Sequence, residues 1–211
     1  MPADADATGR PRGDGKRRGV LLVLAGTSGA GKGTVGSLLR EADPELRWSV
    51  SWTTRAPRPG EREGIDYHFV SREAFEALRD DGGFLEWFEV YGDLKGTPIG
   101  YVRDELAAGH DVMLEIDVQG ALAVKKKLPE ALLVFVQAPS RVEQRRRLEA
   151  RGSDSEESIA RRLEQAEAEE RIGAEQFDAV VVNRDVDQAV DDLAAILKRR
   201  RDPPPGEHEG A

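Results

Sequence analysis

Gly19-Val-Leu-Leu-Val-Leu-Ala25 is followed directly by Gly26-Thr-Ser-Gly-Ala-Gly-Lys32, and these two stretches decide the fold. The first is a continuous apolar run, which is typical of a parallel strand covered on both faces. The second is rich in glycine and ends the apolar run, and over residues 31–41 the apolar side chains return at helical spacing. The chain therefore opens with a strand, a glycine-rich turn and a helix.

The glycine-rich turn matches the pattern Gly-x-x-x-x-Gly-Lys in the context that makes this pattern meaningful. Glycines let backbone N–H groups point inward at phosphate oxygens, and the helix N-terminus adds partial positive charge. Lys32 is expected to reach the β- and γ-phosphates of a nucleoside triphosphate. The alternative is a simple turn with a surface lysine, which the strand, spacing and lysine together disfavour. The predicted ATP-binding loop comprises Gly26, Thr27, Ser28, Gly29, Ala30, Gly31, Lys32, Gly33 and Thr34.

The residue after Lys32 affects the expected metal site. The pattern usually has Ser or Thr there, whose hydroxyl contacts Mg²⁺, but this chain has Gly33 and then Thr34. One residue along a helix rotates a side chain by about 100°, so we expect Thr34 to face the α- or β-phosphate. Mg²⁺ is then held by phosphates and waters, which it retains readily. Asp117, which follows the apolar residues 112–116, is predicted to orient those waters, and the alternative is a helix cap.

The rest of the chain alternates between strand and helix patterns. Apolar runs predict strands at 111–117, 131–137 and 177–183, and helical spacing predicts helices at 140–151, 155–172 and 187–200. Such alternation implies a parallel sheet. Residues 48–109 are rich in aromatics, Gly and Pro and predict an inserted lobe. Residues 1–18 and 201–211 show no periodicity and predict disordered tails.

Composition excludes several classes of protein. The 211 residues include no cysteine, which excludes disulfides, thiolate metal sites and thiol nucleophiles and fits a reducing compartment. The formal net charge of −9 disfavours a nucleic-acid partner. The first nineteen residues have no apolar core, so we expect no secretory signal in them, and the apolar runs are too short to span a bilayer. We therefore expect a cytoplasmic protein with no membrane partner that binds small nucleotides.

Five further sequence motifs accompany the phosphate loop. They are Ser49-Val-Ser-Trp-Thr-Thr-Arg-Ala-Pro-Arg-Pro-Gly-Glu61, Gly64-Ile-Asp-Tyr-His-Phe-Val70, Phe84-Leu-Glu-Trp87, Leu114-Glu-Ile-Asp-Val-Gln-Gly120 and Arg147-Leu-Glu-Ala-Arg-Gly152. With these strings the chain resembles the guanylate kinase family over about residues 19–198. The resemblance implies a three-layer α/β P-loop fold with a parallel sheet, in which a domain at 19–200 carries a GMP-binding lobe near 48–109 and a helical lid near 141–162.

The resemblance also implies the acceptor site. Arg55, Arg58 and Tyr67 match the residues that hold the GMP phosphate, and two planar guanidinium groups suit a phosphate dianion. The residues implied around the acceptor guanine are Ser51, Glu86, Thr97 and Glu115, and Asp117 is also expected among the GMP-binding residues. Guanine presents N1–H and a 2-amino group, both donors, so the carboxylate of Glu86 can accept from guanine where adenine would leave it unpaired.

Lid arginines that close over the triphosphate are implied at Arg147, Arg151 and Arg162, and Asn183 matches a position near the adenine. Together with Lys32 and Arg55, the three lid arginines form the expected catalytic set. Phosphoryl transfer depends mainly on alignment and cationic stabilisation, so no general base is expected. The chain departs from the family pattern at three further positions. Thr27 replaces a usual Pro, and Trp52 precedes the two threonines. Lys95 stands where a second phosphate-binding tyrosine is expected, so that a cation would meet the phosphate.

The predicted reaction is ATP + GMP ⇌ ADP + GDP with Mg²⁺, with dGMP as a further acceptor, in a monomer or homodimer. Two alternatives remain. One is a non-catalytic module whose GMP lobe binds a peptide; Lys32 and the lid arginines disfavour it, while Gly33 and Lys95 keep it open. The other is a P-loop kinase with a different acceptor, such as AMP or a phosphorylated sugar. A signalling GTPase is disfavoured because the sequence has no Asn-Lys-x-Asp motif.

Overall fold

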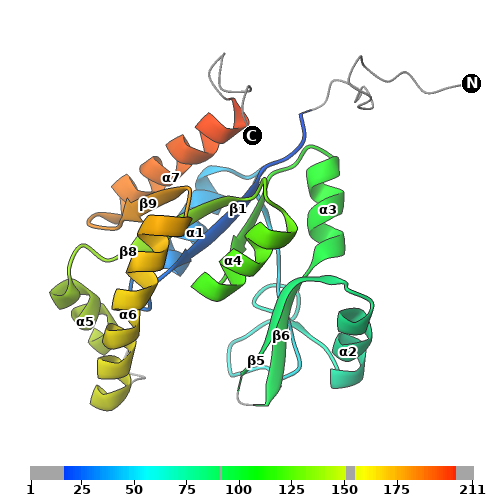
Figure 1. Cartoon of the computed structure of the whole chain (residues 1–211), viewed down its shortest axis with the longest axis horizontal. Coiled ribbons are helices and arrows are strands. Elements are labelled where there is room, and N and C mark those ends of the chain that lie inside the picture. Colours follow the sequence, from blue (N-terminus) through cyan, green and yellow to red (C-terminus); the bar gives the residue numbers. More distant parts are fainter. Residues whose placement is uncertain (1–16, 91, 151–154, 203–211) are drawn as a thin grey trace, which may run out of the picture.

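A five-stranded parallel sheet lies at the centre of the protein (Figure 1), for which a computed structural model describes residues 17–90, 92–150 and 155–202. The strand order is β2-β7-β1-β8-β9. The bounds are β1 (Leu21–Gly26), β2 (Arg47–Trp48), β7 (Val112–Glu115), β8 (Leu132–Gln137) and β9 (Ala179–Val182). The four strands expected from apolar runs are confirmed, with shifted or shorter ends.

Helices cover both faces of this sheet, which gives three layers. The helices α1 (Lys32–Ala42) and α7 (Val186–Arg201) pack on one face, and α3 (Ile99–Ala107), α4 (Val118–Lys127) and α6 (Glu156–Gln176) lie on the other (Figure 1). Successive residues of β1 point to opposite faces, so Leu22 and Leu24 pack with residues of α1 and α7, and Leu21 and Val23 pack with residues of α3 and α4. Burial on both faces explains why β1 is apolar throughout.

The inserted lobe has a sheet of its own. Its strands follow the order β4-β3-β6-β5, beside one helix. The bounds are β3 (Trp52–Thr53), β4 (His68–Phe69), α2 (Arg72–Asp80), β5 (Phe84–Val90) and β6 (Asp93–Pro98). A separate small core of Phe75, Phe84 and Leu94 stabilises it, with the first two rings stacked 4.3 Å apart. Helix α3 falls within the predicted lobe range but packs on the main sheet through Val102 and Leu106.

The predicted lid corresponds to α5 (Arg141–Ala150) and the first residues of α6. Two hydrogen bonds of 3.1 and 2.9 Å from the Arg141 guanidinium to the Glu170 carboxylate join these helices. Arg151 lies outside the described residues. Within the three described segments, no helix combines the length and the apolar character needed to cross a bilayer.

The folded part of the chain extends further at both ends than the sequence predicts. Arg17 and Arg201, expected in the tails, both contact Asp111, whose side chain is buried and which directly precedes β7. Arg17 Nη1 donates to Asp111 Oδ1 at 2.8 Å, the Val20 N–H donates to the same oxygen at 2.7 Å, and Arg201 Nε donates to Oδ2 at 2.5 Å. A buried carboxylate needs such partners, which explains why both arginines belong to the fold.

Asp111→Asn is expected to lower the free energy of unfolding at neutral pH by about 2 kcal/mol, because hydrogen bonds between charged groups are lost. Burial opposes ionisation of Asp111, but the bonds from Arg17, Val20 and Arg201 outweigh burial and lower its pKa. A carboxyl with a lowered folded-state pKa contributes stability above the unfolded value and loses it as the pH falls through the folded one. The deficit of the variant should therefore shrink as urea unfolding is measured at increasingly acidic pH.

Asp191→Asn, at an exposed position on α7, is the matched control and should change stability by less than about 0.5 kcal/mol. A deficit in Asp111→Asn that is constant with pH would contradict the ionic account of this cluster.

Candidate functional site

The candidate site lies at the carboxyl end of β1. This strand is the switch point of the sheet, since β7 and β8 flank it, and ligands of open α/β sheets bind at such points. A cavity of about 520 Å³, here called the central cavity, opens there between the phosphate loop and the inserted lobe. Its lining includes Lys32, Thr53, Arg55, Arg58, Phe88, Asp93, Lys95, Glu115 and Asp117.

The phosphate loop has the backbone that an anion cradle requires. Gly29 and Gly31 have φ values of 81° and 90°, in the left-handed region that favours glycine. A Cβ at Gly31 would lie only 2.4 Å from Asn183 Nδ2, so a larger residue does not fit. Gly31 is also the N-cap of α1, and it has no side chain to accept from the N–H groups of the first turn. These N–H groups can therefore serve a phosphate.

Lys32 is the first residue of α1, and its side chain turns back over the loop. Its Nζ donates to the carbonyl oxygens of Gly26 at 2.7 Å and Thr27 at 3.3 Å. The same side chain lines the central cavity. Lys32 is therefore placed at the cavity wall that the phosphate loop forms. Gly33 and Thr34 are exposed in the same helical turn.

Two predicted lid arginines contact the phosphate loop. Arg147 donates from Nη1 to Ala30 O at 3.2 Å, and Arg162 donates from Nη1 to Ser28 Oγ at 2.9 Å. The structure thus brings segments far apart in sequence to one loop. Asn183 is buried behind this loop, and its Nδ2 donates to Ala30 O at 2.9 Å, so its amide braces the loop.

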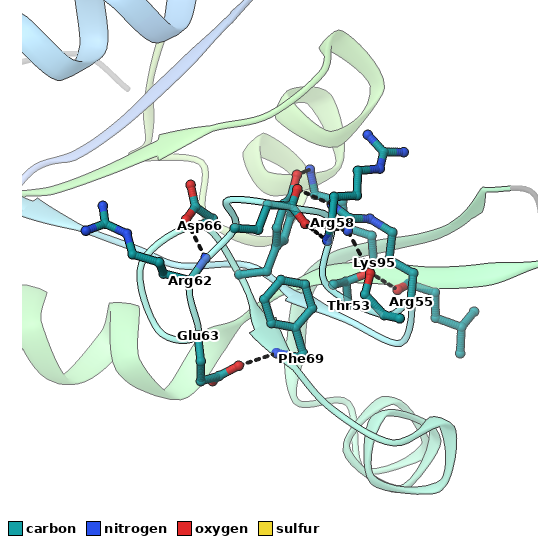
Figure 2. Close-up of polar contacts among 12 residues, drawn as sticks. Thr53, Arg55, Arg58, Arg62, Glu63, Asp66, Phe69 and Lys95 are labelled. Carbon is teal, nitrogen blue, oxygen red and sulfur yellow. Dashed lines mark hydrogen bonds and ion pairs between the residues drawn. The ribbon is translucent and has the colours of Figure 1, made fainter.

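The lobe presents an arginine held rigidly by a glutamate. Both terminal nitrogens of Arg55 donate to the Glu61 carboxylate at 2.6 Å, and the Arg58 N–H donates to the same carboxylate at 2.8 Å. The Arg55 bond is the main cause of a lowered Glu61 pKa, about 2. The Arg55 guanidinium also lies over the Tyr67 ring, 5.0 Å from its centroid. Figure 2 shows Arg55, Arg58 and Lys95 gathered in this cluster.

Tyr67 and Lys95 border a second cavity of about 410 Å³, here called the lobe cavity, which Ser51 and Glu115 also line. Lys95 Nζ donates to Tyr67 Oη at 3.2 Å. Since Lys95 lines the central cavity as well, the two cavities meet at its side chain. The residues predicted to hold the acceptor phosphate, namely Arg55, Arg58, Tyr67 and Lys95, are therefore brought together.

Glu86 is the most unusual polar residue of the site. It is only 3% exposed, and pairing of β5 with β6 sets it opposite Thr97, whose hydroxyl donates to Glu86 Oε1 at 2.6 Å. Its other oxygen, Oε2, is buried and without a hydrogen-bond partner among the described residues. Burial raises the Glu86 pKa; the Thr97 bond opposes this shift and nearby Asp117 adds to it. A buried acceptor of this kind calls for a donor from a ligand.

A third cavity, of about 480 Å³ and here called the base cavity, is lined by Glu86, Phe88, Asp117 and residues of α6. Asp117 also lines the central cavity, so it connects the two. It is the N-cap of α4, because its Oδ1 accepts from the Gly120 N–H at 2.8 Å. The helix cap that the sequence left as an alternative is therefore present. Glu115 faces the phosphate loop, with both carboxylate oxygens 3.6 Å from where a Cβ at Gly33 would lie.

Sequence reasoning missed three polar residues of the site. Glu61 ends one of the quoted strings but was given no role. Gln144, 1% exposed, donates from Nε2 to Ser28 O at 2.7 Å and so ties α5 to the phosphate loop. Glu169 on α6 lines the base cavity, and burial raises its pKa while the charge of Lys32 opposes that shift. Glu169 stands in a helix with many glutamates, so only the fold distinguishes it.

Comparison with known proteins shows the family of the chain. The sequence matches the guanylate kinase family over residues 18–200. A guanylate kinase of Thermus thermophilus is 53% identical over 184 residues, which cover 87% of this chain and 83% of that protein. A guanylate kinase of Rubrobacter xylanophilus is 49% identical over 183 residues, covering 87% and 95%. The crystal structure of guanylate kinase from Anaplasma phagocytophilum aligns with a TM-score of 0.70 at 35% identity, covering 88% of each chain.

Proposed function

Since this chain belongs to the guanylate kinase family, we propose that it transfers the terminal phosphoryl group of ATP to GMP, and also to dGMP, giving the nucleoside diphosphates. The reaction belongs to purine nucleotide metabolism, and we place it in the cytoplasm. Its partners are the small-molecule substrates, with no nucleic acid or membrane involved, and the enzyme acts as a monomer or homodimer.

The observation that carries the choice of acceptor is the unpaired Oε2 of Glu86. A carboxylate oxygen can only accept, and guanine offers two adjacent donors at N1 and the 2-amino group. Adenine offers an acceptor at N1, which would face this oxygen without a proton between them. The buried position of Glu86 makes such a mismatch costly. The base cavity therefore suits guanine.

The acceptor phosphate is held where Arg55, Arg58, Tyr67 and Lys95 converge, at the junction of the central and lobe cavities. The bidentate bond to Glu61 fixes the Arg55 guanidinium, which reduces the ordering needed when the phosphate binds. Across the central cavity, the phosphate loop receives the triphosphate of ATP. The two nucleotides are thus held with their phosphates facing each other.

Catalysis follows from alignment and positive charge. The acceptor phosphate is already an oxyanion, so no residue has to remove a proton from it. Lys32 stabilises the transferred phosphoryl group. To reach it, the Lys32 ammonium gives up its hydrogen bonds to the carbonyl oxygens of the phosphate loop. Arg55 helps to position the attacking phosphate. Arg147 and Arg162 reach the loop from the lid, and Arg151 acts with them when the lid closes over ATP and excludes water.

We propose that Mg²⁺ accompanies ATP. The residues of the site fit an ion held largely through phosphate and water oxygens, because Gly33 offers no hydroxyl while Glu115 and Asp117 present carboxylates to the central cavity. Asp117 would orient bound water with the oxygen that does not cap α4. When bound, the ion offsets negative charge on the β- and γ-phosphates.

Release of ADP, measured by a coupled assay with AMP, GMP, dGMP, UMP and CMP as acceptors, tests the proposal. We expect turnover with GMP and dGMP and less than about 1% of that rate with the other three. No ADP release above the level with ATP alone would favour the peptide-binding module. Faster turnover with AMP would favour the kinase with another acceptor.

A further inference from the structure

Lys95 lies on β6 where the central and lobe cavities meet. Its Nζ is 3.2 Å from the Tyr67 hydroxyl oxygen and 5.0 Å from the centroid of that ring. The close-up shows Lys95 beside Arg55 and Arg58 (Figure 2). A compact ammonium group therefore joins two guanidinium groups at the acceptor-phosphate site.

The balance of charge makes this third cation important. Glu61 accepts two bonds of 2.6 Å from Arg55, so much of the Arg55 charge is already compensated. The lining of the central cavity holds four basic and three acidic side chains, and loss of Lys95 would remove the excess of positive charge. The Coulomb energy scales with the product of the charges. A dianionic ligand therefore gains more from Lys95 than a monoanionic ligand does.

The contact with Tyr67 also determines which way the Tyr67 hydroxyl proton points. An ammonium group can only donate, so Tyr67 Oη is the acceptor of the Lys95 bond. The Tyr67 O–H is then left to donate elsewhere. An anionic oxygen at the junction of the two cavities would accept hydrogen bonds from the Lys95 ammonium and from the Tyr67 hydroxyl. A neutral ester oxygen in the same place would not gain the Coulomb attraction to Lys95.

We infer that Lys95 is a specificity-determining residue that makes the acceptor site selective for a dianionic phosphate monoester over a singly charged phosphate diester. The inference rests on the proposed function, because it concerns the phosphate of GMP. It assigns Lys95 to binding and selectivity, through its charge and through the orientation of the Tyr67 hydroxyl, and not to the chemical step.

The test compares two ligands that differ in charge at the phosphate. GMP carries two negative charges at mildly alkaline pH, and the 5′-monomethyl ester of GMP carries one. The KM for GMP and the inhibition constant of the ester are measured for the parent, Lys95→Met and Lys95→Arg. We expect Lys95→Met to raise the KM for GMP by about 10-fold or more and to weaken the ester by less than about 3-fold. Its kcat and its KM for ATP should stay near the parent values.

Lys95→Arg should recover most of the preference for the dianion, and Lys126→Met, at an exposed position on α4, should leave it unchanged. Added salt should raise the KM for GMP more in the parent than in Lys95→Met. Equal weakening of both ligands, or a loss confined to kcat, would overturn the assignment. This failure differs from failure of the proposed function, in which the parent itself would not phosphorylate GMP.

Discussion

Lys32→Met is expected to reduce kcat for GMP phosphorylation by about 10³-fold or more, because the variant loses the cation that meets charge developing on the transferred group. Lys32 stands at the first position of α1 and lines the central cavity, and no other residue of the phosphate loop carries a side-chain charge. Methionine keeps the length of the side chain and removes its charge. The KM for GMP should change little, since the acceptor is held by the lobe.

The fold of this variant should be intact. The bonds from Lys32 to the Gly26 and Thr27 carbonyls are two among many that position the loop, and the side chain is half-buried. Steady-state kinetics and thermal unfolding would be measured together, with Lys126→Met as the control for loss of a lysine. Retained turnover in Lys32→Met would show that the phosphate loop does not receive the reacting group.

Glu86→Gln is expected to raise the KM for GMP by about 100-fold and to leave the KM for ATP unchanged. The Thr97 hydroxyl keeps the side-chain carbonyl oxygen in place through the Oε1 contact. The amide nitrogen then occupies the Oε2 position and points donors at the donors of guanine. Glu89→Gln, at an exposed position on the same strand, is the matched control. Unchanged GMP affinity in Glu86→Gln would remove this residue from base recognition.

The same variant should be at least as stable as the parent when no nucleotide is bound. The raised pKa of Glu86 means that folding disfavours its ionised form. The contribution of Glu86 to stability is then full below its unfolded pKa and is lost as the pH rises through its folded pKa. At neutral and alkaline pH, Gln should therefore match or exceed Glu in thermal unfolding. A GMP concentration just sufficient to saturate the parent should stabilise the parent and have little effect on the variant.

The main sheet is predictable from sequence because its strands are buried on both faces. The run that forms β1 is apolar throughout, and the run that forms β8 is apolar up to its last residue, Gln137. The helices between such runs repeat apolar residues at the spacing of one face. The lobe gives weaker signals. Strands β3 and β4 have only two residues each, too few for an alternating pattern, and their pairing is set by contacts distant in sequence.

The helix α4 was also not predicted from the sequence, in part because the role of Asp117 before it is ambiguous. An aspartate that ends a strand can cap the next helix or serve a metal, and the sequence cannot separate the two uses. In the structure, one oxygen caps α4 while the residue still lines the central cavity. The five quoted sequence strings predicted which residues form the acceptor site. The Arg55–Glu61 bond, the Gln144 contact and the unpaired oxygen of Glu86 instead depend on three-dimensional packing.

The position of GMP in a crystal structure of the complex with a non-hydrolysable ATP analogue tests the central claim most directly. The account predicts guanine N1–H and the 2-amino group within hydrogen-bond distance of Glu86 Oε2, and the GMP phosphate between Arg55, Arg58 and Lys95. It predicts the analogue's phosphates at the amides of the phosphate loop. A GMP molecule bound elsewhere, with Glu86 Oε2 still unpaired, would contradict it.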